Sequence, residues 1–192
     1  MPPRLISDTM LELFPMVRTP GHHVSSAIHA IMAKLYPARF GSGPIDQMRA
    51  ILGNALEHAI VEAYARDHPE RFVRPGEIEC EGLLGTPDLW DLEDPYDPAT
   101  VEIKLTWASS RRADDIEDEW FVRYWWQLKA YNYMARLGMS GRGFTRGRLI
   151  IVFLVGNWRD DSAPKGLMWE DEWTDGELAE NWEMIKRYVT PE

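Results

Sequence analysis

Apolar residues recur every three or four positions in several segments, which indicates helices that bury one face. The longest pattern starts at Gly43-Pro44 and reaches about His68, and a proline suits a first helical turn. A second long pattern runs from Asp118 to about Leu137. Shorter helices are expected over Asp8–Leu13, over Ser25–Tyr36 and, after the capping pattern Thr174-Asp175-Gly176-Glu177, to about residue 189.

Strands are predicted where β-branched and apolar residues gather between turn signals. The most apolar run, Leu149–Val155, suits a strand that is buried on both faces. The other predicted strands are Ile78–Leu84, Thr86–Leu92, Thr100–Thr106 and, at an edge, Leu167–Trp169. Loops are expected over Ala108–Glu117 and over Gly138–Arg148, the second of which is rich in glycine and arginine. The sum is an α/β fold with a central mixed β-sheet flanked by helices.

Length and composition limit the class of protein. The chain has 192 residues, 45% of them hydrophobic, which is enough to bury one core, and we expect a single domain over residues 1–192. It contains no run of 18 apolar residues and no signal-peptide pattern, so we expect a cytoplasmic protein without a membrane partner. One cysteine, Cys80, excludes an intramolecular disulfide and a four-cysteine metal cluster, and it suits a buried strand position.

Candidate chemistry lies in the predicted strands. Pro87-Asp88 precedes Glu102-Ile103-Lys104, and residues i and i+2 of a strand point to the same face. If Asp88 lies alongside, two carboxylates and an ammonium group converge. Carboxylates bind divalent metals such as Mg²⁺, and a lysine can orient water or neutralise developing charge. These residues therefore predict metal-assisted hydrolysis of a phosphodiester.

This arrangement resembles the PD-(D/E)XK nuclease superfamily, in which Pro-Asp is followed by Asp/Glu-x-Lys. Upstream, Gly53-Asn54-Ala55-Leu56-Glu57 is similar to the Gly-x-x-x-Glu helix of the RecB-like and phage-exonuclease branches. Downstream, Gln127-Leu128-Lys129-Ala130-Tyr131 is similar to the Gln-x-x-x-Tyr helix of the RecB-like branch. The four motifs stand in the order of that branch. The cysteine count sets the chain apart from members that carry an iron–sulfur cluster.

The resemblance implies a restriction-endonuclease-like fold, with a catalytic core over about residues 44–155 and a C-terminal capping helix over about residues 174–189. It implies that Asp88, Glu102 and Glu57, with the Ile103 carbonyl, bind Mg²⁺ or Mn²⁺, and that Lys104 positions the attacking water. It also implies that Gln127 and Tyr131 orient the lysine or the scissile strand.

A net charge of −10 is unusual for a protein that binds DNA, because phosphate neutralisation drives affinity. The charge is unevenly spread, since residues 57–103 carry −10 and residues 104–148 carry +4. We therefore expect arginines of the basic segment to contact phosphates, while Ser25 either contacts DNA or caps a helix. The arginine candidates are Arg111, Arg112, Arg136, Arg142, Arg146 and Arg148.

The resemblance favours an exonuclease that acts on DNA ends in recombination, repair or phage DNA processing, in a bacterial, archaeal or phage-infected cell. A structure-specific or nicking endonuclease is an alternative within the same class. A non-cleaving acidic module that binds DNA or protein is an alternative from another class. A homo-oligomer or a recombination or replication partner protein is compatible with all three.

Overall fold

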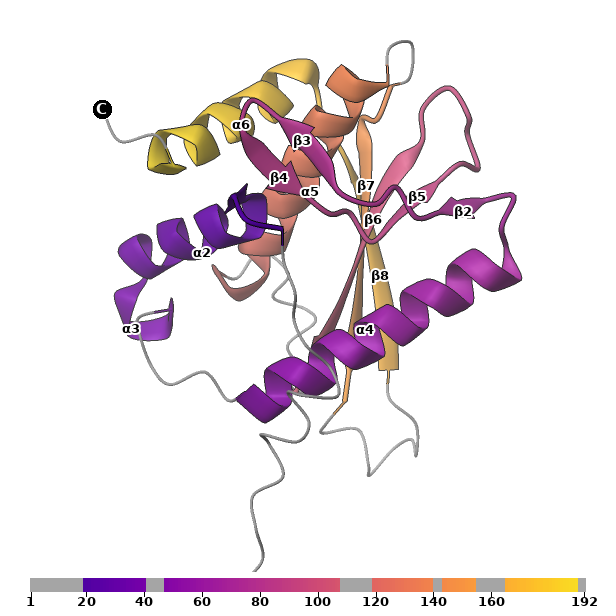
Figure 1. Ribbon diagram of the computed structural model, residues 1–192, viewed down its shortest axis with the longest axis horizontal. Coiled ribbons are helices and arrows are strands. Elements are labelled where there is room, and N and C mark those ends of the chain that lie inside the picture. The colour runs from indigo at the N-terminus through magenta and orange to yellow at the C-terminus, as the bar shows by residue number, and fades with distance from the viewer. Residues whose placement is uncertain (1–18, 41–46, 108–118, 140–142, 155–164, 190–192) are drawn as a thin grey trace, which may run out of the picture.

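A five-stranded mixed sheet lies at the centre of the protein (Figure 1). In the computed structural model, which describes residues 19–40, 47–107, 119–139, 143–154 and 165–189, the strand order is β2-β5-β6-β7-β8. Strands β6 and β7 run parallel, and the other neighbours are antiparallel. The strands are β2 (Phe72–Val73), β5 (Leu89–Asp91), β6 (Ala99–Thr106), β7 (Arg146–Phe153) and β8 (Lys165–Glu172).

A smaller three-stranded sheet packs beside the first, in the order β1-β4-β3. Its strands are β1 (His22–His23), β3 (Ile78–Cys80) and β4 (Leu83–Gly85). The helices of the described residues are α2 (Val24–Leu35), α3 (Pro37–Phe40), α4 (Gln47–Asp67), α5 (Glu119–Gly138) and α6 (Asp175–Val189). None of the described helices combines the length and the apolar character that crossing a membrane requires.

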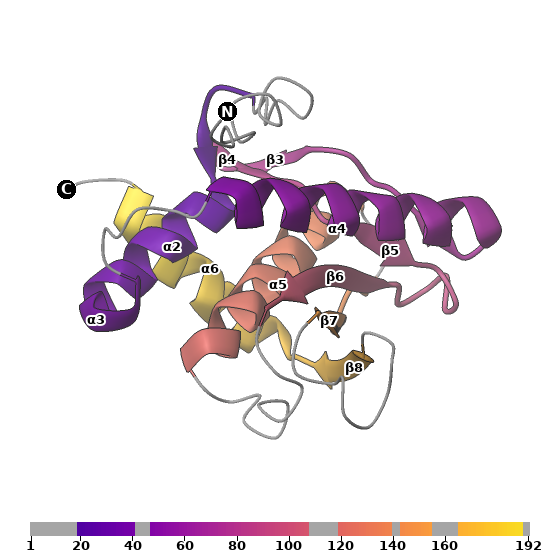
Figure 2. The same ribbon diagram turned by 90° about the horizontal axis from the view of Figure 1, so that it is seen from below.

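The two faces of the central sheet are covered by different helices, and Figure 2 shows α4 on one side of β6 and α5 on the other. Val101 and Ile103 of β6 join Val61 of α4 in one buried cluster. Side chains on the opposite face of β7, such as Leu149 and Ile151, pack against α5 and α6. Glu102 and Lys104 pair in register with Leu149 and Ile151, so they point toward the α5 face.

The predicted α/β fold is confirmed, with changes at the strand ends. The expected strand Ile78–Leu84 is wrong as one piece, because the chain turns at Glu81 and Gly82, whose φ values are 49° and 81°. Positive φ at both central residues is the geometry of a two-residue hairpin turn. Cys80 is buried at the end of β3, as predicted.

The expected strand Thr86–Leu92 is shorter in the structure, where β5 begins at Leu89. Asp88 therefore lies in the bend before the strand rather than on it. Residues 149–153 of the predicted run Leu149–Val155 belong to β7, which is hydrogen-bonded to strands on both sides, and the edge strand is confirmed as β8. The loop predicted over Gly138–Arg148 is too long, because α5 includes Gly138 and β7 begins at Arg146.

The helix predictions agree closely with the structure. α2 begins at Val24 and ends before Pro37, and α4 and α5 cover most of the two long patterns. The capping box is also confirmed, since the Thr174 N–H donates to Glu177 at 2.8 Å and the Glu177 N–H donates to the Thr174 hydroxyl at 3.3 Å. The helix expected over Asp8–Leu13 and the loop over Ala108–Glu117 lie outside the described residues.

Candidate active site

The candidate site lies where β6 continues beyond its neighbour β5. The pairing of β5 with β6 stops at Leu89 and Val101, whereas β6 extends to Thr106. On this stretch the Ile103 N–H donates to Asp88 Oδ2 at 2.8 Å, and the Leu105 N–H donates to Glu57 Oε1 at 3.0 Å. Backbone N–H groups in a folded core need acceptors. Two carboxylates thus take the place of the missing strand, one from the bend before β5 and one from α4.

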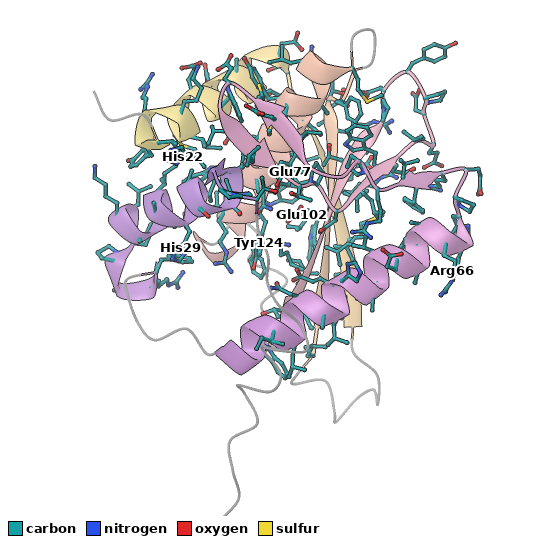
Figure 3. The ribbon with its side chains drawn as sticks, viewed as in Figure 1. His22, His29, Arg66, Glu77, Glu102 and Tyr124 are labelled. Carbon is teal, nitrogen blue, oxygen red and sulfur yellow. The ribbon has the colours of Figure 1, made fainter. Side chains whose placement is uncertain are left out.

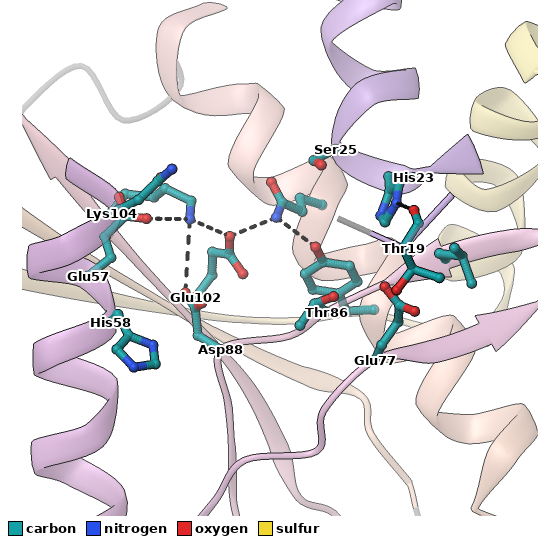
Figure 4. Close-up of a pocket in the computed structure, with 14 residues that line it drawn as sticks. Thr19, His23, Ser25, Glu57, His58, Glu77, Thr86, Asp88, Glu102 and Lys104 are labelled. Carbon is teal, nitrogen blue, oxygen red and sulfur yellow. Dashed lines mark hydrogen bonds and ion pairs between the residues drawn. The ribbon is translucent and has the colours of Figure 1, made fainter. Parts of the chain in front are cut away.

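Lys104 lies among three carboxylates (Figure 4). Its Nζ is 2.7 Å from Glu102 Oε1, 3.4 Å from Glu57 Oε2 and 3.9 Å from Asp88 Oδ2. The four residues come from α4, the bend and β6, and the structure brings them together as the sequence motifs predict. They line a cavity of about 700 Å³ together with Thr19, His23, Ser25, Asn54, His58, Glu77, Leu84, Thr86, Gln127 and Tyr131.

The Gln-x-x-x-Tyr pair of α5 reaches one of these carboxylates, Glu102, on the face of β6 that α5 covers. Gln127 Nε2 donates to Glu102 Oε1 at 2.7 Å and to the Tyr131 hydroxyl at 2.8 Å. Tyr131 itself is buried, with only 3% of its surface exposed. Gln127 therefore orients Glu102 directly, and the tyrosine supports that glutamine from within the core.

Burial and charge shift the protonation of the buried groups of the site. Burial raises the pKa of the Glu102 carboxyl to about 8, even though the Lys104 ammonium acts in the opposite direction. Burial alone would lower the pKa of Lys104, but the surrounding carboxylates outweigh it and raise that pKa well above its usual value. Burial, reinforced by the Glu102 charge, also raises the pKa of the Tyr131 hydroxyl. Lys104 therefore stays charged at neutral pH.

The donor set fits a divalent cation, although Lys104 now holds the central position. As the described side chains stand, no three His, Cys, Asp or Glu residues form a ready metal-binding group. The second oxygen of Glu102, Oε2, is nevertheless buried without a hydrogen-bond partner. Carboxylate oxygens are the ligands that Mg²⁺ and Mn²⁺ prefer. A buried carboxylate oxygen without a partner, next to two further carboxylates, is a position that a cation would satisfy.

Other predicted contact residues have different outcomes. Ser25 lines the cavity, but it is the second residue of α2, whose N-cap is His23, so the capping role predicted for Ser25 is wrong. Arg111, Arg112 and Arg142 lie outside the described residues. Arg136, Arg146 and Arg148 are paired with Asp175, Asp97 and Asp91, and none of the three lines the cavity.

Sequence reasoning missed several residues that line the cavity. Asn54 and His58 lie on α4 next to Glu57, and helical periodicity from Glu57 would have found Asn54 one turn earlier. Glu77 and Thr86 come from segments on either side of the β3–β4 hairpin. Nothing in the local sequence marks these two, because the hairpin that brings them together was not predicted.

Comparison with known proteins gives the fold. No family model matches the chain, and no curated protein matches it in sequence. Its structure is similar to that of an alkaline exonuclease (LHK-Exo) from Laribacter hongkongensis, with a TM-score of 0.52 and 17% identity over 93% of this chain and 90% of that one. LHK-Exo in complex with dAMP gives a TM-score of 0.51 and 16% identity over 88% and 86% of the two chains.

A crystal structure of the protein SSO0001 gives the same TM-score, 0.51, at 14% identity over 98% of this chain and 89% of that one. The protein therefore has the restriction-endonuclease-like α/β fold that the sequence motifs predict, shared with an alkaline exonuclease. The resemblance to PD-(D/E)XK nucleases is confirmed at the level of the fold.

Proposed function

We propose that this protein is a metal-dependent deoxyribonuclease that hydrolyses phosphodiester bonds at DNA ends. One observation carries the proposal: Glu57, Asp88, Glu102 and Lys104, from three separate segments, meet in one cavity of an exonuclease-like fold. An acidic protein that only bound a partner would have no need for a half-buried lysine among three carboxylates.

The carboxylates of Asp88, Glu102 and Glu57, with the Ile103 carbonyl, would hold Mg²⁺ or Mn²⁺. Such a cation, when bound, polarises the phosphate and lowers the pKa of a bound water. Asp88 and Glu57 are fixed by the backbone N–H groups of Ile103 and Leu105, so they are oriented before a ligand arrives. Gln127 does the same for Glu102.

Lys104 has two tasks in this proposal. Its ammonium stays protonated, so it donates a hydrogen bond to the attacking water and stabilises the negative charge that grows on the phosphate oxygens. The water oxygen bonds to phosphorus and gives up one proton to solvent, while the bond from phosphorus to the leaving sugar oxygen breaks. That oxygen takes up one proton from solvent, so the step adds one water across the bond. Ser25 lies at the cavity wall, where it can contact the DNA strand, and Arg111 and Arg112 remain proposed phosphate contacts.

Action at DNA ends is the finer part of the proposal, and the fold shared with an alkaline exonuclease supports it. The test compares end-labelled linear duplex, single-stranded and closed circular DNA, each with Mg²⁺ or Mn²⁺. Loss of linear DNA alone is the expected result. Nicked circular DNA would show that the protein is an endonuclease and not an exonuclease. Intact DNA in every case would overturn the proposed activity.

The assignment of the site is tested by Lys104→Ala. Removal of a group that stabilises transition-state charge should lower kcat by about 10²- to 10³-fold. Lys34→Ala is the matched control, since Lys34 lies on α2 beside the Tyr188 ring and away from the cavity. Circular dichroism should show both variants folded. Full activity of folded Lys104→Ala would show that this lysine has no role in the reaction.

A further inference from the structure

A smaller cavity of about 190 Å³ adjoins the candidate site on the side of α4. The two cavities share five residues, and the boundary between them carries the Glu57 and Asp88 carboxylates. The smaller cavity therefore offers a path for a DNA strand whose scissile phosphate lay at these carboxylates. Its lining residues are Asn54, Glu57, His58, Val61, Arg74, Thr86, Pro87 and Asp88.

Positive charge is scarce along this path. Among the described residues that line the two cavities, the lysine and arginine side chains are Lys104 and Arg74. Lys104 is surrounded by three carboxylates. Arg74 has 43% of its side chain exposed, so it is the cation within reach of a second backbone phosphate.

The backbone places Arg74 beside the bend that contains Asp88. It directly follows β2, whose Val73 pairs with Trp90 of β5, and Asp88 lies just before that strand. The Arg74 guanidinium is paired with the Glu62 carboxylate of α4. The same Glu62 oxygen is 3.7 Å from His58 Nε2. A carboxylate and a phosphodiester offer an arginine the same kind of anionic oxygen.

We propose that Arg74 binds a backbone phosphate of the DNA strand next to the scissile phosphodiester, and that Glu62 holds the guanidinium until DNA replaces it. The inference rests on the proposed function, since it assumes that the carboxylates mark the scissile position. Arg74 is then a positioning residue, which acts on the strand and not on the reacting atoms.

The experiment measures binding of a short fluorescein-labelled oligothymidylate by anisotropy, with Ca²⁺ in place of Mg²⁺, over a series of salt concentrations. Loss of one charged contact in Arg74→Ala should raise Kd about tenfold. It should also reduce the slope of log K against log salt by about 0.7, the value for one single-strand phosphate. In cleavage with Mg²⁺ the loss should fall on KM, with kcat little changed.

Glu62→Gln separates phosphate binding from a merely structural ion pair. If Glu62 competes with DNA for Arg74, this variant binds the oligonucleotide several-fold tighter, and the gain disappears in Arg74→Ala/Glu62→Gln. If the pair only ties β2 to α4, both single variants lose stability and neither changes Kd, which would overturn the proposal. A gain that persists without Arg74 would overturn it too, because it would reflect general charge.

Arg66, labelled at the end of α4 in Figure 3, provides the matched control. It forms a similar exposed pair with Asp67, and neither residue lines either cavity. Arg66→Ala and Asp67→Asn should leave Kd and the salt slope unchanged. Arg74→Lys, which keeps the charge, should retain the slope and guards against a folding defect in Arg74→Ala.

The two proposals fail separately in this design. If the wild type cleaves DNA but Arg74→Ala has an unchanged Kd, the proposed phosphate contact of Arg74 is wrong and the proposed nuclease activity stands. If oligonucleotide binding depends on Arg74 but no DNA is cleaved, the phosphate contact stands and the proposed nuclease activity is wrong.

Discussion

Glu102 is the residue on which the candidate chemistry depends most. One of its oxygens accepts from Gln127 and pairs with Lys104, and the other is buried without a partner. Its carboxyl has a pKa of about 8 because it is almost fully buried. Near neutral pH it therefore carries a proton much of the time, and a cation that binds there has to displace that proton.

This displacement predicts pH-dependent metal affinity. The metal-bound form needs an ionised Glu102, so protons compete with the cation below the pKa of about 8. The affinity for Mn²⁺ should rise up to about tenfold per pH unit as the pH increases toward 8, and level off above it. Calorimetry in buffers of different ionisation enthalpy should detect the released proton. An affinity independent of pH would contradict the role of Glu102.

Gln127 should act through Glu102. Gln127→Ala removes the donor that orients the carboxylate, so metal affinity or activity should fall about 10- to 100-fold. Tyr131→Phe removes only the hydroxyl that accepts from Gln127, and its effect should be smaller. Mn²⁺ titration and steady-state cleavage measure both. If Tyr131→Phe matched Gln127→Ala, the orientation of Gln127 would depend fully on the Tyr131 hydroxyl.

At this scale the sequence predicted the main residues of the candidate site, because strand alternation places Glu102 with Lys104 and helical spacing places Gln127 with Tyr131. It could not predict which hydrogen bonds they make. The attachment of Gln127 to Glu102 rather than to Lys104 depends on how α5 lies over β6. Arg74 carries no sequence signal, since its position depends on the pairing of β2 with β5.

At the scale of elements, close packing of α5 and α6 on β7 depends on a glycine. A Cβ at Gly147 would lie 2.5 Å from Trp173 Cη2 and 2.7 Å from Cζ3, and an indole in the core cannot move aside easily. Gly147→Ala should therefore lower the free energy of unfolding by about 1–3 kcal/mol. The measurement is urea denaturation followed by tryptophan fluorescence.

Gly166→Ala is the control in a neighbouring strand. Gly166 lies on β8, and a Cβ there would meet nothing within 4 Å. Its effect should stay within about 0.5 kcal/mol. Equal stability of the two variants would show that Trp173 gives way.

The elements themselves were predictable where the pattern is long. Helices α4 and α5 follow from periodicity, and β7 follows from its apolar run. The β3–β4 hairpin was missed because Glu81 adopts a positive φ, which the sequence does not announce at a glutamate. The sequence also could not predict that Asp88 lies in a bend, because the start of a short strand such as β5 depends on its pairing with neighbouring strands.

At the scale of the whole molecule, several charged side chains of the described residues form ion pairs across the sheet. Arg71 donates to Asp91 through two nitrogens at 2.8 Å, and Arg148 pairs with the same carboxylate. Arg148 also pairs with Glu170 of β8. Asp91 is almost fully buried, so it needs these partners. Arg148, which the sequence suggested as a phosphate contact, serves here to join β5, β7 and β8.

Arg148→Ala should therefore behave as a stability variant. The loss of the donors shared by Asp91 and Glu170 should cost about 1–3 kcal/mol in unfolding free energy. The salt slope of oligonucleotide binding should not change, in contrast to Arg74→Ala. A reduced slope, measured on the folded variant, would show that Arg148 contacts the phosphate backbone after all.

The stretch of β6 that extends beyond β5 has a consequence for how related sequences are compared. Asp88 and Glu57 each accept a backbone N–H, so a descendant that had lost catalysis would still be under selection to keep an acceptor at both positions. Lys104 has no such structural duty, and the free oxygen of Glu102 serves no backbone group. We therefore expect loss of activity in a lineage to appear first at positions 102 and 104. Asparagine in place of Asp88, or glutamine in place of Glu57, would keep the hydrogen bond to the β6 backbone but lose the negative charge.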